Sequence, residues 1–345
     1  MDFSRPDNAR KINRMKVLSA LRRETLSRAE LSRELLINKV SISEITDSLI
    51  KDSLVVEAEK EMTTGRPATK LTINRNAGRV FSIELRKASV SVSISDTLGR
   101  ILRFERVPRG ENLWKDVEET CVRLAKGYSI LGVAVVTSEN IEIELPWPSV
   151  KISPAEAEAK AEIDNVEASL DGFYFVSWNE NIEAAFLNKH LYSIPSFAHI
   201  KVAKTGACSC GREGCLEAVA SGDALKESTG IKSLKSIATN NDFVRTPARA
   251  MVFALSQAVQ AVGAKSIMIT GEFSAMSDEI FADMQEKLTS SLPEDRKDVY
   301  IFRSSCQEGG LSIGASLLAL DNFFYNSKVL ESLKDLESSS LNPLI

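Results

Sequence analysis

The segment from His199 to Ser221 carries three of the chain's five cysteines and one of its two histidines. Its metal-ligand side chains are His199, Cys208, Cys210 and Cys215. One imidazole and three thiolates at short spacing form a set that Zn²⁺ accepts in tetrahedral geometry. Four protein ligands fill the coordination sphere, so we predict a structural zinc site. The alternative is a disulfide or scattered free thiols, which leaves His199 unexplained.

The same segment resembles the zinc signature of the ROK family (repressors, open reading frames, kinases). A histidine is followed by the pattern C-x-C-G-x-x-G-C-L-E and then a serine. The family contains bacterial sugar kinases and sugar-responsive transcription repressors. The resemblance therefore implies an α/β protein with a two-lobed, actin-like ATPase (ribonuclease H-like) body. This segment does not distinguish a sugar kinase from a transcription repressor, so that distinction depends on the rest of the chain.

Charge is distributed unevenly along the 345 residues. Residues 1–75 hold 15 Lys and Arg against 11 Asp and Glu, a surplus of +4, so the remainder carries 28 against 36, or −8. A basic module on an acidic body suggests contact with a polyanion at one end. The sequence shows no secretion signal and no apolar run near the ~20 residues of a membrane helix. We therefore expect a cytoplasmic protein without a membrane partner.

Residues 8–51 have the apolar spacing of three short helices. Ser27 and Glu30 form a capping box at the start of the second helix. A short turn precedes the third, in which five apolar residues are expected to be buried: Val40, Ile42, Ile45, Leu49 and Ile50. This arrangement predicts a helix-turn-helix whose third helix reads the major groove of DNA. The expected DNA contacts on that helix are Asn38, Lys39, Ser41 and Ser43.

Two alternating segments, 55–59 and 70–74, follow the third helix and predict the strands of a wing. The turn between them holds Arg66 between Gly65 and Pro67. An arginine held in this way can enter a narrow minor groove, where the potential is most negative. A plain hairpin with a solvated arginine is the alternative. The G-R-P turn is similar to the wing of ROK repressors, so we expect Arg66 to contact DNA.

The sites that a ROK kinase needs for ATP are altered in this chain. The resemblance places an Asp and two glycines in the first body hairpin, where Glu84, Arg86 and Lys87 stand. Phosphate binding needs close backbone approach, which glycine permits and bulky side chains obstruct. A second phosphate-side loop is shortened to the single Gly271. We therefore expect the nucleotide site to be lost.

The sugar site of the family is also altered. Its N-D-A-N stretch, followed by an alanine-rich helix, corresponds to residues 179–185, with Glu180 in place of the base Asp and Ile182 in place of an Asn. The family's Glu-x-Gly-His corresponds to residues 196–199, and Glu217 matches a sugar-binding Glu. The candidate effector-binding residues are Asn179, Glu180, His199 and Glu217.

We therefore predict a winged helix-turn-helix domain (1–75), two ROK lobes (76–188 and 189–330, the second with the zinc site) and a tail (331–345). The expected function is a non-enzymatic, DNA-binding regulator, a repressor of carbohydrate-related genes. Its expected partners are a double-stranded operator, a sugar or sugar-phosphate effector, and a second copy in a homodimer or homotetramer. The alternatives are a sugar kinase with Glu180 as base, and a DNA-bound scaffold controlled by a protein partner.

Overall fold

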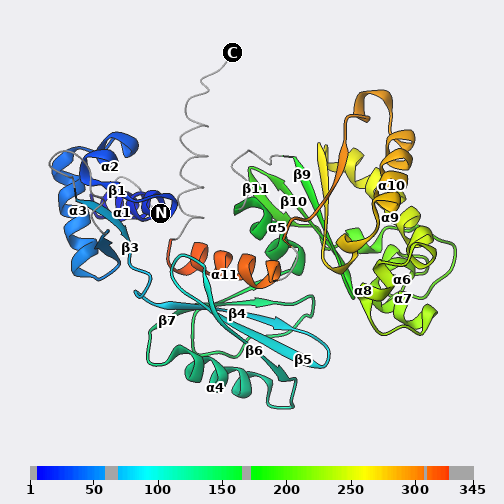
Figure 1. Cartoon of the computed structure of the whole chain (residues 1–345), viewed down its shortest axis with the longest axis horizontal. Helices are drawn as coiled ribbons and strands as arrows, with labels where there is room; N and C mark the ends of the chain where they lie inside the picture. Colours follow the sequence, from blue (N-terminus) through cyan, green and yellow to red (C-terminus); the bar gives the residue numbers. More distant parts are fainter. Residues whose placement is uncertain (1–5, 59–68, 165–171, 307–308, 326–345) are drawn as a thin grey trace. The chain divides into compact units, whose positions relative to one another are not determined.

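The computed structural model describes residues 6–58, 69–164, 172–306 and 309–325 (Figure 1). The described residues divide into two compact units. The first comprises those up to Val135, with Asn140–Lys151 and those from Ser316 onward; the second comprises Val136–Glu139 and the rest of Ile152–Ala315. The finer division at residues 75, 188 and 330 stays a prediction. No helix in the described part of the chain is both long and apolar enough to cross a membrane.

The first unit begins with three helices and a small sheet, as predicted. The helices are α1 (Pro6–Arg23), α2 (Arg28–Leu35) and α3 (Lys39–Lys51), and the sheet has the order β1 (Leu26–Ser27), β3 (Lys70–Ile73), β2 (Val55–Glu57). Ser27 and Glu30 form the predicted capping box. Leu31, Ile42 and Leu49 are fully buried between the helices. The turn with Arg66 lies outside the described residues.

The next sheet of the first unit has five strands. Their order is β6 (Ile101–Pro108), β5 (Ser89–Ser95), β4 (Arg79–Leu85), β7 (Ile130–Val136), β8 (Ser149–Ile152). Helix α4 (Leu113–Ala125) covers one face of this sheet through Val117, Cys121 and Leu124 (Figure 1). Cys121 is a fully buried core thiol.

The second unit contains a sheet with the same strand order. It runs β11 (His190–Ser193), β10 (Ile182–Asn188), β9 (Phe173–Trp178), β12 (Ser266–Thr270), β13 (Tyr300–Arg303). In both sheets the third strand along the chain is at one edge, followed by the second, first, fourth and fifth. In the second sheet β9 pairs with β10 antiparallel and with β12 parallel. This repeated order confirms the expected actin-like architecture.

The remaining helices of the body surround these sheets. They are α5 (Pro154–Asp164), α6 (Leu216–Ala220), α7 (Gly222–Thr229), α8 (Leu234–Ala238), α9 (Asn241–Val262), α10 (Asp278–Ser291) and α11 (Gly310–Phe323), with short 3-10 turns η1 (Phe197–His199), η2 (Glu272–Ala275) and η3 (Glu294–Arg296). The small residues of α11 permit close packing. A Cβ on Gly314 would lie 1.7 Å from the carbonyl oxygen of Ala157.

One expectation for the body differs from the structure. Residues 182–188 form strand β10 rather than the alanine-rich helix that the resemblance implies, because Ala184 and Ala185 are buried within the sheet. After the cysteines, α6 and α7 meet at Ser221, whose side chain caps α7. Cys306 is half-buried.

The end of α1 is joined to the end of α11 within the first unit. The Arg22 guanidinium pairs with the Asp321 carboxylate and lies 4.7 Å from the centre of the Tyr325 ring. The Tyr325 hydroxyl in turn donates to the carbonyl of Thr97, 2.7 Å away. The Arg22 and Asp321 side chains are only 17% and 10% exposed, so solvent screens this pair less than a surface ion pair.

A buried carboxylate joins the carboxyl ends of β9 and β12 in the second unit. Glu158 on α5 accepts hydrogen bonds from Thr270 (2.5 Å) and from the Asn179 amide (3.2 Å). Burial raises the pKa of Glu158 to about 6, although hydrogen bonds from Thr270, Ser177 and Asn179 act in the opposite direction. The carboxylate therefore lies at the centre of a network that fixes both strand ends.

The raised pKa of Glu158 makes stability depend on pH. Its folded pKa of about 6 exceeds the ordinary 4.5, so the folded state binds more protons between these values. Protonated Glu158 contributes its full stabilisation below pH 4.5, the pKa in the unfolded chain. This contribution is lost as the pH rises through about 6, the pKa in the folded protein. The unfolding free energy of the wild type should therefore fall between pH 5 and pH 7.5. In Glu158→Gln this fall should be smaller by about 1 kcal/mol, because the titrating carboxyl is absent.

Urea denaturation at the two pH values measures this difference. Glu286→Gln, an exposed substitution on α10, should retain the wild-type difference. An unaltered difference in Glu158→Gln would show that the carboxyl is not the titrating group.

Candidate nucleic-acid interface and metal centre

Helix α3 is held by its neighbours on one side and open to solvent on the other. Ile42, Ile45, Thr46 and Leu49 are its buried residues. Its start is fixed by Asn38, whose side-chain oxygen accepts from the Ser41 backbone N–H at 2.9 Å. Leu36, at the end of α2, adopts a left-handed conformation with φ of 55° and reverses the chain direction. The turn between the two helices is therefore tight, as in a helix-turn-helix.

Two arginines lock α3 to the other helices. Arg14 of α1 donates to Ser48 at 2.7 Å and to Asp52 at 2.5 Å. Arg28 of α2 donates to Thr46 at 3.0 Å and to Asp47 at 2.7 Å. These bonds orient α3 and neutralise two of its acidic neighbours.

The predicted DNA contacts occupy the open end of α3. Asn38 and Lys39 are exposed, while Ser41 and Ser43 are half-buried. The Ser43 hydroxyl donates to the Lys39 carbonyl at 3.0 Å, which leaves its oxygen available as an acceptor. The first turn of a helix also favours anions, because its N–H groups are unpaired and the helix dipole is positive there. Arg66 cannot be placed, because it lies outside the described residues.

The prediction that Val40 is buried is wrong, because its side chain is 69% exposed. It lies two residues before Ile42, about 200° around the helix from this core residue, and so faces away from it. The spacing to Ile42, Ile45 and Leu49 could have identified Val40 as a surface residue. Leu36, at 92% exposed, is a second apolar side chain on the surface of the turn.

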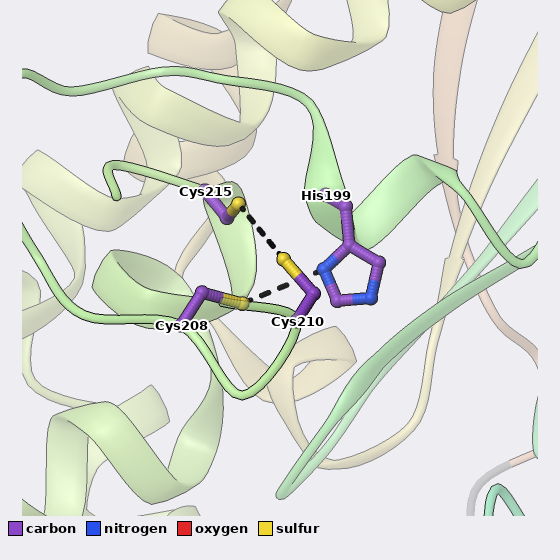
Figure 2. A group of neighbouring side chains, drawn as sticks. All are labelled: His199, Cys208, Cys210 and Cys215. Carbon is purple, nitrogen blue, oxygen red and sulfur yellow. Dashed lines mark hydrogen bonds between the residues drawn. The ribbon is translucent and has the colours of Figure 1, made fainter. Parts of the chain in front are cut away.

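The four predicted metal ligands meet at one point of the second unit (Figure 2). Their donor atoms all lie within 4.8 Å of one another. Cys208 Sγ is 3.5 Å from His199 Nδ1, and Cys210 Sγ is 3.7 Å from Cys215 Sγ. A disulfide needs sulfurs about 2.05 Å apart, so the thiols are unbonded. The cluster has the donors and the size to hold a metal ion.

The loop around the cluster depends on two glycines. Gly211 has φ of +82° and its N–H bonds to the Cys208 carbonyl at 2.9 Å. A Cβ on Gly214 would lie 1.9 Å from the Ala203 carbonyl oxygen. Both positions therefore exclude other residues, one by backbone conformation and the other by close contact.

The cysteines differ in their tendency to ionise. Hydrogen bonds from the side chain and backbone of Arg212 lower the pKa of Cys210 to about 6. Burial raises the pKa of Cys215 to about 11, and its hydrogen bonds to the other two thiols act in the same direction. A cation at the centre would favour the thiolate form of all three cysteines. Arg212 was not identified from the sequence, although it lies between two of the ligands.

The candidate effector residues are engaged with the protein itself. The Asn179 amide donates to Glu158 and to Ser177 (3.0 Å), and its oxygen accepts from the Glu272 backbone N–H at 2.8 Å. A Cβ on Gly271 would lie 2.5 Å from Asn179, so the shortened phosphate-side loop packs directly on this amide. Asn179 therefore stabilises the fold through the hydrogen bonds of its amide.

The two candidate carboxylates also have internal partners. Glu180 pairs with Lys226 of α7 at 3.0 Å, and Glu217 accepts from the Ile182 backbone N–H at 2.9 Å. Phe197 is fully buried and makes an edge contact with the Tyr174 ring, so it belongs to the core. Lys226 is a further charged member of this group, and no short sequence pattern identifies it, because it is 46 positions from Glu180.

The altered hairpin of the first unit also contains paired side chains. Arg86 Nε donates to the Glu84 carboxylate at 2.6 Å, and Arg109 donates to the Arg86 carbonyl at 3.2 Å. Side chains thus cover the turn between β4 and β5, where a phosphate would need open backbone N–H groups.

Comparisons with known proteins agree with this architecture. Residues 193–322 match the model of the ROK family. A search of curated proteins found no match. A ROK family transcriptional regulator, a homologue of the E. coli Mlc protein, is 18% identical with a TM-score of 0.73, and the match covers 94% of this chain and 99% of the regulator.

Sugar kinases share the body of the fold. A ROK hexokinase from Thermus thermophilus is 19% identical with a TM-score of 0.57, covering 70% of this chain and 98% of its own. A ROK family glucokinase from Streptomyces griseus, solved with glucose and AMPPNP, is 16% identical with a TM-score of 0.52. The match covers 70% of this chain and 99% of the glucokinase. Residues 193–322 are thus a ROK family domain, in a chain that combines an N-terminal helix-turn-helix with an actin-like ATPase-fold body.

Proposed function

We propose that this chain is a sequence-specific DNA-binding transcriptional regulator, a repressor of carbohydrate-related genes. The observation that carries the proposal is helix α3: one face is buried and pinned by Arg14 and Arg28, while its first turn opens to solvent. A rigid helix with an open N-terminal end is the element that enters a major groove. The coverage of 94% of the chain by a regulator, against 70% by the kinases, supports the same proposal.

The kinase alternative is less well supported by the side chains. A base at Glu180 must take a proton from a sugar hydroxyl, but this carboxylate pairs with Lys226. The hairpin expected to approach ATP holds the Glu84–Arg86 pair. Two groups needed for phosphoryl transfer are therefore committed to other contacts, so the proposed protein is not an enzyme.

The proposed effector is a sugar or a sugar phosphate. Asn179 is held at both its polar atoms, whereas Glu180 and Lys226 are partly exposed, with side-chain exposures of 37% and 27%. Lys226 pairs with Glu180 at 3.0 Å and lies 3.8 Å from Asp223, so an effector bound here would replace contacts that these side chains make with one another. The proposed assembly is a homodimer or homotetramer in the cytoplasm, which presents paired reading helices to a pseudo-palindromic operator.

The proposed metal is a structural Zn²⁺ held by His199, Cys208, Cys210 and Cys215. Bonds of about 2.3 Å to sulfur and about 2.05 Å to nitrogen put tetrahedral ligands about 3.8 Å (S to S) or about 3.6 Å (S to N) apart. The distances of 3.7 Å and 3.5 Å in the cluster fit these edges. The ion would tie the 208–215 loop to η1.

A DNA-binding measurement tests the proposed function. Duplexes selected from a random pool by the full-length protein should bind in a salt-dependent manner. Lys39→Ala should weaken binding across sequences and reduce the slope of log affinity against log salt by about 1, because one phosphate contact is lost. Lys51→Ala, an exposed substitution at the other end of α3, should leave the slope unchanged. Failure to bind any duplex at low ionic strength would contradict the proposal.

Metal analysis tests the zinc proposal. The purified chain should contain about one equivalent of zinc, and Cys208→Ser should lose it and unfold at lower temperature, because metal binding contributes directly to folding. Cys306→Ala, a half-buried cysteine outside the cluster, should retain the metal. Wild-type zinc content in Cys208→Ser would remove this residue from the ligand set.

A further inference from the structure

Glu44 is an acidic residue on the open face of α3 that has no side-chain partner among the described residues. It is exposed, and it lies in the second turn of the helix. The neighbouring acids differ in this respect, since Asp47 pairs with Arg28 at 2.7 Å and Asp52 pairs with Arg14 at 2.5 Å. Glu44 thus presents an uncompensated negative charge on the proposed reading surface.

Such a charge opposes binding to the DNA backbone. A carboxylate near phosphates adds Coulombic repulsion and lowers non-specific affinity. It fits the groove only where it meets a hydrogen-bond donor on a base edge. In the major groove the amino group of cytosine, N4–H₂, is the donor that Glu and Asp accept from. The isolated position of Glu44 therefore favours direct base contact over phosphate contact.

Val40 lies four residues before Glu44, on the same side of α3. It is 69% exposed, although the central apolar residues of the helix are buried. In a major groove, an exposed aliphatic side chain finds its apolar partner in the C5-methyl group of thymine. Four residues of helix rise about 6 Å, which corresponds to about two base-pair steps. Val40 and Glu44 can therefore reach neighbouring bases of one half-site.

We propose that Glu44 reads a cytosine and Val40 a thymine, one or two base pairs apart in each half-site of the operator. This inference rests on the proposed DNA-binding function and assigns its sequence specificity to these two side chains. Lys39, at the start of the helix, supplies the phosphate contact that positions them.

The test begins with half-sites selected from random duplex DNA by the wild-type full-length chain. Glu44→Gln should move the preference at one position from cytosine to adenine, because glutamine pairs with adenine N6 and N7. The change should be about 5- to 150-fold in relative affinity, the range for one good base contact. Glu44→Ala should lose the preference there without gaining a new one.

Glu57→Gln is the control for net charge. Glu57 is exposed on β2, off helix α3, so removing its charge should raise non-specific affinity as Glu44→Gln does. It should not change which base is preferred. If Glu57→Gln changes the preference at the same position, the assignment to Glu44 is wrong and the effect is one of net charge.

Replacing the thymine by deoxyuracil tests Val40, because this base lacks only the methyl group. The replacement should weaken wild-type binding several-fold and have no effect on Val40→Ala. Equal weakening of both proteins would overturn the Val40 assignment. If selected duplexes bind but Glu44→Gln keeps every base preference, the Glu44 assignment fails while the proposed function stands. If the wild type binds no duplex, both fail.

Discussion

The second unit depends on the buried carboxylate of Glu158. It bonds to Thr270 at the end of β12 and to Asn179 just after β9, the two parallel strands at the centre of the sheet. Burying a charged or polar group is costly unless it is hydrogen-bonded, so the network must remain intact for these strand ends to stay in register. Asn179 extends it to the Glu272 backbone and the Gly271 turn.

This network occupies the place where the family resemblance puts sugar chemistry. Catalysis requires polar groups that are free to meet substrate and are positioned within a fraction of an ångström. Here the amide of Asn179 stabilises a turn, Glu180 pairs with a lysine, and Glu217 holds the start of β10. These contacts stabilise the body and occupy the polar groups that the resemblance assigns to the sugar. The Glu84–Arg86 pair has the same effect in the first unit.

The local patterns that the sequence predicts well are those set by neighbouring residues. The capping box of Ser27 and the three helices follow from short-range spacing. The metal cluster follows from His199 and three cysteines, because few other arrangements use such a set. The prediction that Val40 is buried is wrong, because its position on the helix turns this apolar side chain away from the buried face.

Long-range contacts were not accessible from the sequence. Glu158 and Thr270 are 112 positions apart, and Arg22 and Asp321 are 299 apart, so no local pattern joins them. The alanines of β10 have helical propensity, but burial between neighbouring strands determines their conformation. Arg22 joins the end of α1 to the end of α11, because it contacts both Asp321 and Tyr325.

The central claim is that this body keeps the kinase fold but not phosphoryl transfer. The direct measurement is transfer of labelled phosphate from ATP and Mg²⁺ to a panel of hexoses and amino sugars by the purified full-length chain. We predict no sugar phosphate above the level formed without protein. Multiple turnovers that are abolished in Glu180→Gln would contradict the account.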